Sequence, residues 1–399
     1  MRVLLSIVSV CLVWVATTVA QDLSIIKTGA TKTMLDVSSL KQGGGKAEEF
    51  VNVIQNDLTR SGWFKVVKDR GATIRLHGEV GTSGETLTIS LELLNTATGR
   101  PYFSRKQSER LGDLRRVAHA LSDDIVKAVR GKRGMASTRI ALIGSLAGKK
   151  NLYVCDSDGR GITRLTKDDV ACLSPAWDPS GDNLYYTSFH KGFPDVYRID
   201  MKNLRRSAVS SHPGVNAGPS LSRDGKMIAL TLSRDGNPEL YTMSVGSGRL
   251  TRLTRTRFAA EASPSWSPDG KQIVYVSDVT GSPHLYIIGR KGGQGRRLTR
   301  KGSQNVAPDW GTTGKIVFSS RRDGAYHLVM YNPETRKELQ LTRDAADHEE
   351  PSWAPDGRHI VYVRTKSYRM ELYVLDTLGD PEIRLSPLKG DWYSPAWSP

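Results

Sequence analysis

Short runs in which apolar and polar residues alternate make up most of the chain after about residue 139. Typical examples are Ile273–Ser277 and His284–Ile288, which are rich in β-branched and aromatic residues and are followed by turn-forming Gly, Pro or Asp. A period of two places successive side chains on opposite faces of an extended strand. The C-terminal two thirds of the chain is therefore predicted to be antiparallel β-sheet.

One motif recurs at a nearly constant spacing through this region. Its fullest copy is Pro264–Gly270, Pro-Ser-Trp-Ser-Pro-Asp-Gly, and successive leading prolines lie 44, 45, 44, 43 and 44 residues apart. Pro-Asp-Gly favours a tight turn, and the Trp supplies a large apolar plate. With three further strands after each motif, every repeat has the four strands of a propeller blade. The six copies begin at Pro175, Pro219, Pro264, Pro308, Pro351 and, in truncated form, Pro395.

The two ends of the repeat region complement each other. Three strands without a Trp-type strand come first, at Arg139–Ile143, Leu152–Cys155 and Ile162–Leu165, and the last Trp-type strand, Pro395–Trp397, has no strands after it. Pairing the two ends completes a sixth blade and removes exposed sheet edges. The predicted fold is an all-β six-bladed β-propeller over residues 135–399, closed by the C-terminal strand and preceded by a small α/β domain.

The same strand order bears on the two cysteines of the predicted mature chain. Cys155 is expected near the end of the third strand of its blade, and Cys172 in the loop after the fourth strand, on the opposite rim. A strand spans about 17–20 Å, whereas a disulfide tolerates Cα separations below about 7 Å. No bridge between them is predicted.

Residues 21–134 lack the repeat and are predicted to form the α/β domain. Helical spacing of apolar residues occurs at Ala47–Leu58 and Leu114–Val129, and alternating strands at Phe64–Val67, Thr73–Val80 and Leu87–Leu94. A three- or four-stranded sheet is expected. The stretch before Gly45 is weakly patterned and is expected to be mobile.

The first twenty residues predict export. Arg2 precedes an apolar run from Val3 to Ala16, and Thr18–Ala20 supplies small residues at the cleavage positions. This pattern is typical of a cleavable signal peptide, residues 1–20, and no later stretch approaches the length of a membrane helix. Cys11 leaves open a lipoprotein signal, although it follows Val10 where a small residue is usual.

The formal net charge of +16 makes the surface basic. The basic residues are spread over hairpin turns such as Arg205-Arg206 and Arg296-Arg297, without the interleaved aromatic residues of nucleic-acid platforms. No nucleic-acid partner is predicted, and a solvated basic surface near an anionic envelope is the preferred interpretation.

The sequence offers no reaction centre. It contains no G-x-S-x-G nucleophile elbow, and His348-Glu349-Glu350 lacks the second histidine of a metalloprotease motif. Asp156, Asp158 and Gly161 resemble the start of a calcium loop, but its twelfth position is Lys167 where a Glu is needed, so a hairpin turn is predicted. No catalytic residue, metal or cofactor is predicted.

Binding is predicted at one rim of the propeller. Loops that enter the Trp-type strands share a rim with loops that join the second and third strands of each blade, and loops on rigid scaffolds are common recognition sites. The expected exposed, partner-binding residues on this rim are His212, Asn216, Arg234, Asp235, Asn237, Glu261, Gln304, Asn305, Arg321, His348 and Glu349.

The combination of signal peptide, α/β domain and six such blades resembles the TolB family, periplasmic components of the Tol-Pal system of Gram-negative envelopes. Local segments similar to the family are Asn56–Phe64, Leu114–His119 and Leu232–Tyr241. In the loop before Pro219 only Asn216 matches the family's Asn-Gly-Ala-Pro pattern, and the stretch Ser24–Gly45 departs from its apolar strand ending in Pro-Phe.

The resemblance implies a non-enzymatic periplasmic protein, peripheral to the outer membrane and monomeric. It implies binding of the peptidoglycan-associated lipoprotein Pal at the channel mouth and of the inner-membrane-anchored TolA through the N-terminal region, in support of outer-membrane integrity and cell division. Two alternatives stay open. One is an envelope propeller that binds anionic polysaccharide, and the other is a hydrolase or lyase, which would need His, Asp and Arg clustered in the channel.

Overall fold

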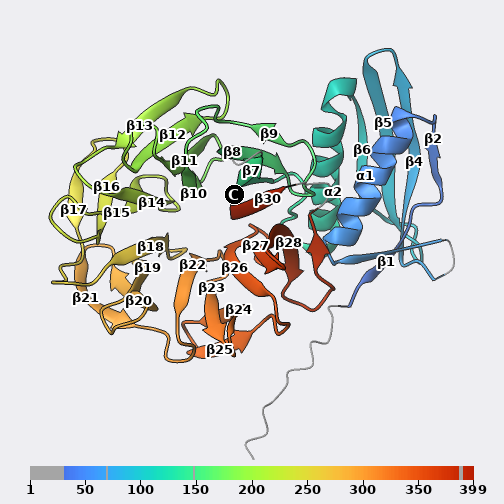
Figure 1. The fold of residues 1–399 in the computed structure, drawn as a ribbon. Coiled ribbons are helices and arrows are strands. Elements are labelled where there is room, and N and C mark those ends of the chain that lie inside the picture. The colour runs from blue at the N-terminus through green and yellow to red at the C-terminus, as the bar shows by residue number, and fades with distance from the viewer. Residues whose placement is uncertain (1–30, 69–70, 147–148, 386–389) are drawn as a thin grey trace, which may run out of the picture.

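The computed structural model describes residues 31–68, 71–146, 149–385 and 390–399. The predicted signal peptide, residues 1–20, lies outside them. A small α/β domain lies beside a ring of six sheets, as Figure 1 shows in blue and then in green to red. The predicted fold class is confirmed.

The α/β domain is one sheet covered by two helices. Its strand order is β3-β1-β4-β5-β6, and β2 pairs with β4. The helices bury Phe50, Ile54, Leu121 and Ile125 in a shared core, and both lie on the propeller side of the sheet in Figure 1. No helix of the described ranges is long and apolar enough to cross a membrane. The elements are β1 (Thr33–Asp36), β2 (Leu40–Gln42), α1 (Lys46–Arg60), β3 (Phe64–Val67), β4 (Ile74–Ser83), β5 (Thr86–Asn95), β6 (Pro101–Arg110), a 3₁₀ turn (Leu111–Asp113) and α2 (Leu114–Arg130).

The expectation of a mobile segment before Gly45 is wrong for residues 33–42. Strand β1 lies inside the sheet, parallel to both β3 and β4, and Leu35 and Asp36 are fully buried. Asp36 accepts hydrogen bonds from the Ser38 hydroxyl at 2.6 Å and from Arg75 Nε at 2.7 Å. Strand β1 is too short to show a periodic pattern, and partners distant in sequence hold it in place. The sheet therefore has six strands rather than the three or four expected.

The propeller consists of six four-stranded antiparallel sheets, numbered here as blades 1 to 6. Blade 1 contains β10 (Cys172–Trp177), β11 (Asn183–Ser188), β12 (Asp195–Asp200) and β13 (Arg206–Ser210); blade 2 contains β14 (Asn216–Leu221), β15 (Met227–Leu232), β16 (Glu239–Ser244) and β17 (Leu250–Arg252). Blade 3 contains β18 (Glu261–Trp266), β19 (Gln272–Ser277), β20 (His284–Gly289) and β21 (Gly292–Arg297); blade 4 contains β22 (Asn305–Trp310), β23 (Ile316–Arg322), β24 (Ala325–Asn332) and β25 (Lys337–Gln340). Blade 5 contains β26 (Asp347–Trp353), β27 (His359–Lys366), β28 (Arg369–Asp376) and β29 (Ile383–Arg384).

Blade 6 joins the two ends of the region as predicted. Its order is β30 (Asp391–Trp397), β7 (Arg139–Leu146), β8 (Lys149–Asp156) and β9 (Thr163–Arg164). Ala396 pairs with Ala141 and Trp397 with Ile140. The Trp397 indole N–H donates to the Thr138 hydroxyl at 2.7 Å. Closure by the C-terminal strand is confirmed.

The innermost strand of every blade carries a bulge just before its motif proline. Ser174, Ser263, Ala307, Glu350 and Ser394 occupy the left-handed region there, with φ between 47° and 52°, and Gly218 holds the sixth position. The strand pairing shifts register at each bulge. An extra residue bends a strand and re-aims its side chains, so the bulges shape the wall of the central channel.

Both cysteines are free and buried. Cys155 lies in the core between blades 5 and 6, and Cys172 in the core between blades 6 and 1. Cys172 is the first residue of β10, so its predicted place in a loop is wrong. Burial raises the pKa of both thiols, which disfavours the reactive thiolate.

Candidate functional site

The propeller has two rims, and only one adjoins the α/β domain. Arg358, in the turn between β26 and β27, donates to the Gly62 carbonyl at 3.2 Å, and Arg60 donates to the Ser157 carbonyl in the β8–β9 turn at 3.1 Å. The loops that enter the innermost strands lie on the opposite rim, together with the loops between second and third strands. We call these two sets of loops the recognition rim. Within the residues that the structure describes, the α/β domain leaves the recognition rim uncovered.

Seven of the predicted binding residues are exposed or half-buried on the recognition rim. Arg234 and Asp235 lie in the β15–β16 loop, where Asp235 accepts a hydrogen bond from the Tyr241 hydroxyl at 2.6 Å. Arg321 lies 5.8 Å from the ring of Tyr326, whose hydroxyl bonds Gln304. These side chains are held by neighbours and still reach solvent. The seven are His212, Arg234, Asp235, Asn237, Gln304, Arg321 and Glu349.

The other four predicted residues are not exposed. Four residues have at most 1% of their surface accessible, because each lies at the start of an innermost strand and packs against the preceding blade: Asn216, Glu261, Asn305 and His348. Asn216 shows their role: its Oδ1 accepts from the Ser210 hydroxyl at 2.8 Å and from the His212 N–H at 2.9 Å. The expectation that they form part of an exposed surface is wrong. They hold the rim loops in place.

The structure adds exposed apolar side chains that the sequence reasoning missed. Phe193, Phe258 and Tyr368 are 71%, 85% and 99% exposed, and all three lie on loops of the recognition rim. Val279, in the β19–β20 loop of the same rim, adds a smaller exposed apolar group. The sequence signal for such a side chain is an aromatic residue within an otherwise polar loop, as in Gly192-Phe193-Pro194. Aromatic side chains are enriched at protein interfaces relative to the rest of a protein surface.

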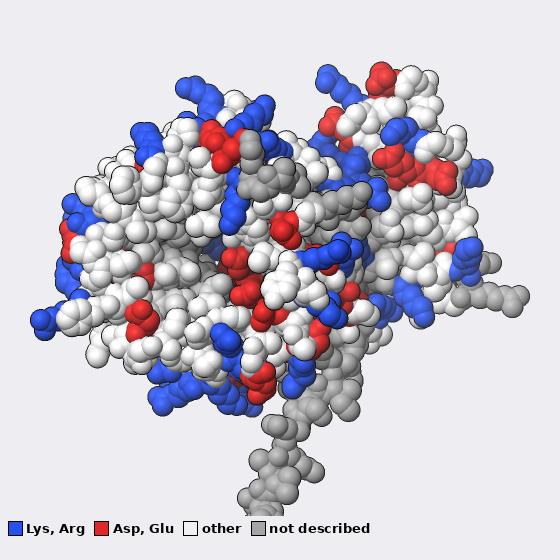
Figure 2. Space-filling view, in the orientation of Figure 1, with Lys and Arg blue, Asp and Glu red and all other residues white. Residues whose placement is uncertain are grey.

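Charge is distributed unevenly over the ring. Acidic side chains gather around its centre in Figure 2, whereas most lysines and arginines lie toward the periphery. Glu349 lies on the innermost strand β26 and is half-buried. Its burial and the neighbouring charges of Asp347 and Glu350 raise its pKa to about 7. A basic protein thus has an acidic centre, which favours a partner with complementary charge.

The central channel contains a cavity of about 500 Å³ lined by the innermost strands. Its wall consists mainly of motif prolines, tryptophans and serines. Asp309 accepts from the Trp353 N–H at 2.6 Å, and Glu350 accepts from the Ser394 hydroxyl at 3.2 Å, so both carboxylates brace neighbouring blades. Burial raises the pKa of both. Arg133 and Arg223 also line it, but no histidine of the described chain does, so the cluster that a hydrolase or lyase would need is not assembled there.

The comparison with protein families decides the relationship. The model of the TolB beta propeller domain matches residues 126–399, well over half of the chain. The chain belongs to the TolB family. The Tol-Pal system protein TolB of Desulfosudis oleivorans is 34% identical over 190 residues, 47% of this chain and 43% of that protein. The TolB homolog of Chlorobium luteolum is 32% identical over 194 residues, 49% and 44% of the two chains.

A solved TolB structure resembles the whole described architecture. TolB from Acinetobacter baumannii superposes with a TM-score of 0.82 at 26% identity, covering 93% of this chain and 98% of that one. In the sequence alignments, by contrast, the chain spans about half the length of the curated TolB relatives it matches. The structural similarity therefore extends over nearly the whole chain, whereas the sequence similarity covers about half of each curated relative.

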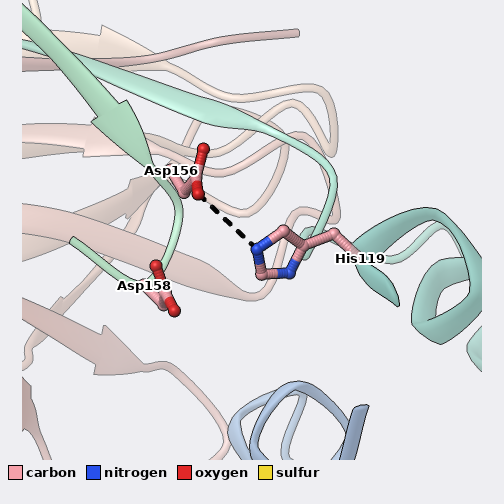
Figure 3. A group of neighbouring side chains, drawn as sticks. All are labelled: His119, Asp156 and Asp158. Carbon is pink, nitrogen blue, oxygen red and sulfur yellow. Dashed lines mark ion pairs between the residues drawn. The ribbon is translucent and has the colours of Figure 1, made fainter. Parts of the chain in front are cut away.

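A partly buried polar network joins the two domains of this TolB-family chain. Figure 3 shows His119 of α2 facing Asp156, the last residue of β8, and Asp158, in the hairpin turn that follows. His119 Nδ1 lies 2.7 Å from Asp57 of α1, and Arg115 binds Asp156 at 3.1 Å and Asp158 at 2.7 Å. The ligand atoms of His119, Asp156 and Asp158 are within 4.8 Å of one another, a spacing that would suit a metal ion. Because Arg115 bonds both carboxylates and His119 also lies against Asp156, we interpret the group as an ion-pair network. The hairpin prediction for Asp156–Gly161 is confirmed.

This network predicts a pH dependence of stability. Burial alone would lower the pKa of His119, but hydrogen bonds to Asp156 and Asp57 raise it to about 9. A histidine whose pKa is higher in the folded state stabilises the fold fully below its unfolded value of about 6.5. That stabilisation is lost as the pH rises through about 9.

We expect His119→Gln to lose this pH dependence and to be less stable than the wild type by ~3 kcal/mol at pH 6, because Asp57 is left buried without its cation. Urea unfolding between pH 6 and pH 10 measures both effects. His77→Gln, which alters a half-exposed histidine bound to Glu92 at 3.1 Å, is the matched control. If the free energy of unfolding changed with pH in the same way for His119→Gln and the wild type, His119 would carry no charge in the folded state.

Proposed function

We propose that this TolB-family chain is a non-enzymatic periplasmic component of a Tol-Pal-type envelope complex, which supports outer-membrane integrity and cell division. Its recognition rim docks a Pal-like peptidoglycan-associated lipoprotein. The proposed organisation is a signal peptide in residues 1–20, an α/β domain in 21–134 and the propeller in 135–399. The observation that carries the proposal is the set of highly exposed aromatic residues on the rim that the α/β domain leaves uncovered.

The rim has the composition of a protein-binding surface. Phe193, Phe258 and Tyr368 supply the large, desolvable anchors in which binding energy is usually concentrated. Around them, exposed Arg234, Asp235 and Arg321 supply the polar surround that such anchors normally have. Four-stranded blades hold the loops on a rigid frame, so little conformational freedom is lost on binding.

The relatives support the choice of partner. Several of them bear the name Tol-Pal system protein TolB, which places those proteins in the Tol-Pal system. We propose for this chain the same system, a Pal-like lipoprotein at the rim and a TolA-like protein at the N-terminal region. The described part of that region starts beside the domain junction. There Lys32 forms an ion pair with Asp380 of the propeller at 2.8 Å.

Retention of a purified, delipidated Pal-like lipoprotein by the immobilised chain tests the proposal. Retention of an anionic glycan by the same immobilised chain is measured in parallel. The glycan is the alternative ligand because the net charge of +16 favours an anionic envelope polymer. The proposal predicts that the lipoprotein is retained at physiological salt and that the glycan is released as salt rises. Retention of the glycan alone would overturn it in favour of the polysaccharide-binding alternative.

A further inference from the structure

Blades 4 and 5 close their central hairpins with the same kind of turn. The loops that join their second and third strands have two residues each, Asp323-Gly324 in blade 4 and Ser367-Tyr368 in blade 5. All four residues have positive φ, with values of 51° and 89° in blade 4 and of 51° and 61° in blade 5. Two successive positive φ values are typical of the type I′ turn, which matches the twist of an antiparallel hairpin.

The two turns differ in how well their residues suit this conformation. Glycine adopts a positive φ without strain because it has no Cβ, and aspartate tolerates the left-handed region, so Asp323-Gly324 is a favoured sequence. Blade 5 has no glycine at either position, and a bulky tyrosine with φ of 61° is a strained outlier. Blade 4 shows that the propeller can form the same turn without this strain. Tyr368 is therefore not required for the turn itself.

No contact within the described chain accounts for the strain. Tyr368 is 99% exposed, and neither its ring nor its hydroxyl has a partner among the described residues. The cross-strand pair beside the turn is also unfavourable, because Lys366 lies directly opposite Arg369 and like charges in such a pair repel. Strained residues cluster at functional sites, where the strain serves binding or catalysis. The tip of this hairpin is therefore a candidate contact for a partner.

The turn is presented on an extension of blade 5. Strands β27 and β28 have eight residues each, whereas the second and third strands of blades 1 to 3 have six. The second strands all begin eight residues after their motif proline, as at Gln272 and His359, so the two extra residues lie at the recognition rim. At about 3.3 Å per residue they lengthen the sheet by about 7 Å. Residues 366–370 are all exposed, on a paired hairpin rather than an irregular loop.

We propose that Tyr368 is an anchor that enters an apolar pocket on the docked lipoprotein, and that Lys366 and Arg369 pair with carboxylates at the edge of that pocket. This inference rests on the proposed function and names the surface that the partner of the recognition rim presents. Tyrosine suits the role because its large ring has only two rotatable side-chain bonds and loses little conformational entropy on binding. Acidic groups on the partner would offset the repulsion between the two cations, an interaction that the free hairpin lacks.

An anionic membrane surface is the other partner that a tyrosine between two cations could contact. A single aromatic side chain and two basic residues attach only weakly to a bilayer, since stable attachment needs a larger buried apolar area or a longer polybasic segment. Acidic side chains also gather at the centre of the ring in Figure 2, and anionic headgroups would repel them. The hairpin therefore favours a protein partner.

Exchange of the two turns tests the proposal. Ser367→Asp with Tyr368→Gly gives blade 5 the turn of blade 4. This variant should have a thermal midpoint about 2 °C higher than the wild type, because the relief of strain exceeds the extra entropy that glycine loses on folding. It should also bind a delipidated Pal-like lipoprotein at least about tenfold more weakly in calorimetric titration. Asp323→Ser with Gly324→Tyr is the matched control for strain and should lower the midpoint by about 2–4 °C.

Reversal of the two charges tests the edge of the proposed pocket separately. Lys366→Glu with Arg369→Glu keeps a like-charge pair at this position of the hairpin, so the unfolding midpoint should not change. Its affinity for the lipoprotein should be at least about tenfold lower than that of the wild type at low salt. The difference should shrink as the salt concentration rises, because salt screens exposed charges.

The outcomes separate this inference from the proposed function. A wild-type chain that does not bind the lipoprotein would contradict both. If the wild type binds it and the variant with the blade 4 turn in blade 5 binds it equally well, only the inference is wrong. The inference also fails if that variant has a lower midpoint than the wild type. Retention of the wild type, but not of the variant, on phosphatidylglycerol vesicles without the lipoprotein would assign Tyr368 to a membrane surface instead.

Discussion

A chain that ends at Ser394 is expected to lose the cooperative unfolding of its propeller. Deletion of residues 395–399 removes the pairing of Ala396 and Trp397 with β7, the hydrogen bond from the Trp397 indole to Thr138, and a Trp that is 94% buried in the core between blades 5 and 6. Loss of one buried aromatic side chain alone costs ~3–5 kcal/mol, and the deletion also exposes the edge of β7. Chemical denaturation monitored by tryptophan fluorescence should show a destabilisation larger than this figure.

Trp266→Ala is the matched comparison for the deletion. Trp266 occupies the same motif position in blade 3 and is equally buried, but its strand stays continuous with the chain on both sides. We expect it to lose only its packing and to keep the elution volume of the full-length protein in size-exclusion chromatography, whereas the truncated chain associates through the open edge. A truncated chain with the midpoint of the full-length protein would disprove the role of β30 in closing the ring.

Arg358→Ala is expected to give the second large effect, at the domain junction. The Arg358 side chain is 3% exposed, binds Asp376 through Nε at 3.0 Å, donates to the Gly62 carbonyl and lies 4.3 Å from the ring centroid of Trp63. Its removal leaves Asp376 buried without its cation, a loss of ~3–5 kcal/mol. It also removes a direct contact between the α/β domain and the propeller, so we expect the two domains to unfold in separate steps by differential scanning calorimetry.

The repeat provides the control for this change. Lys271 follows the Pro-Asp-Gly turn of blade 3 just as Arg358 follows that of blade 5, but its side chain is 79% exposed and only reaches Asp269 at 3.7 Å. Lys271→Ala should leave the calorimetric profile unchanged. A profile for Arg358→Ala that matches that of Lys271→Ala would mean that the junction does not depend on this side chain.

The sequence predicted the architecture because the propeller depends on local, repeated signals. The Pro-x-Trp motif and the turn after it recur at nearly fixed spacing, and the strand left over at Pro395 could pair only with the three strands that begin at Arg139. Features that depend on contacts between distant residues were not visible. The positive φ of Ser174 and Ser263 has no sequence signal, and β1 is defined by neighbours more than 25 residues away.

The sequence placed the candidate binding residues at the recognition rim, where the structure has them, but it did not show which of them are exposed. The adjacent blade determines where a rim loop ends and an innermost strand begins. It covers Asn216 and Glu261, each the first residue of its strand. A polar residue there looks the same in sequence as one in an open loop. Conversely, Phe258 and Tyr368 resemble core residues by composition, and only the fold shows that no blade covers them.

The affinity of a Pal-like lipoprotein for two matched double variants tests the central claim most directly. Phe258→Ser with Tyr368→Ser alters the recognition rim, and Leu204→Ser with Val245→Ser alters exposed apolar side chains of the opposite rim, which are 51% and 38% accessible. Because all four side chains are exposed, both variants should keep the wild-type unfolding midpoint. Isothermal titration calorimetry should show a loss of affinity of at least about tenfold for the first variant, as expected when exposed aromatic anchors are removed, and none for the second. Equal affinities for both variants, or a loss confined to the second, would contradict the placement of the partner on the recognition rim.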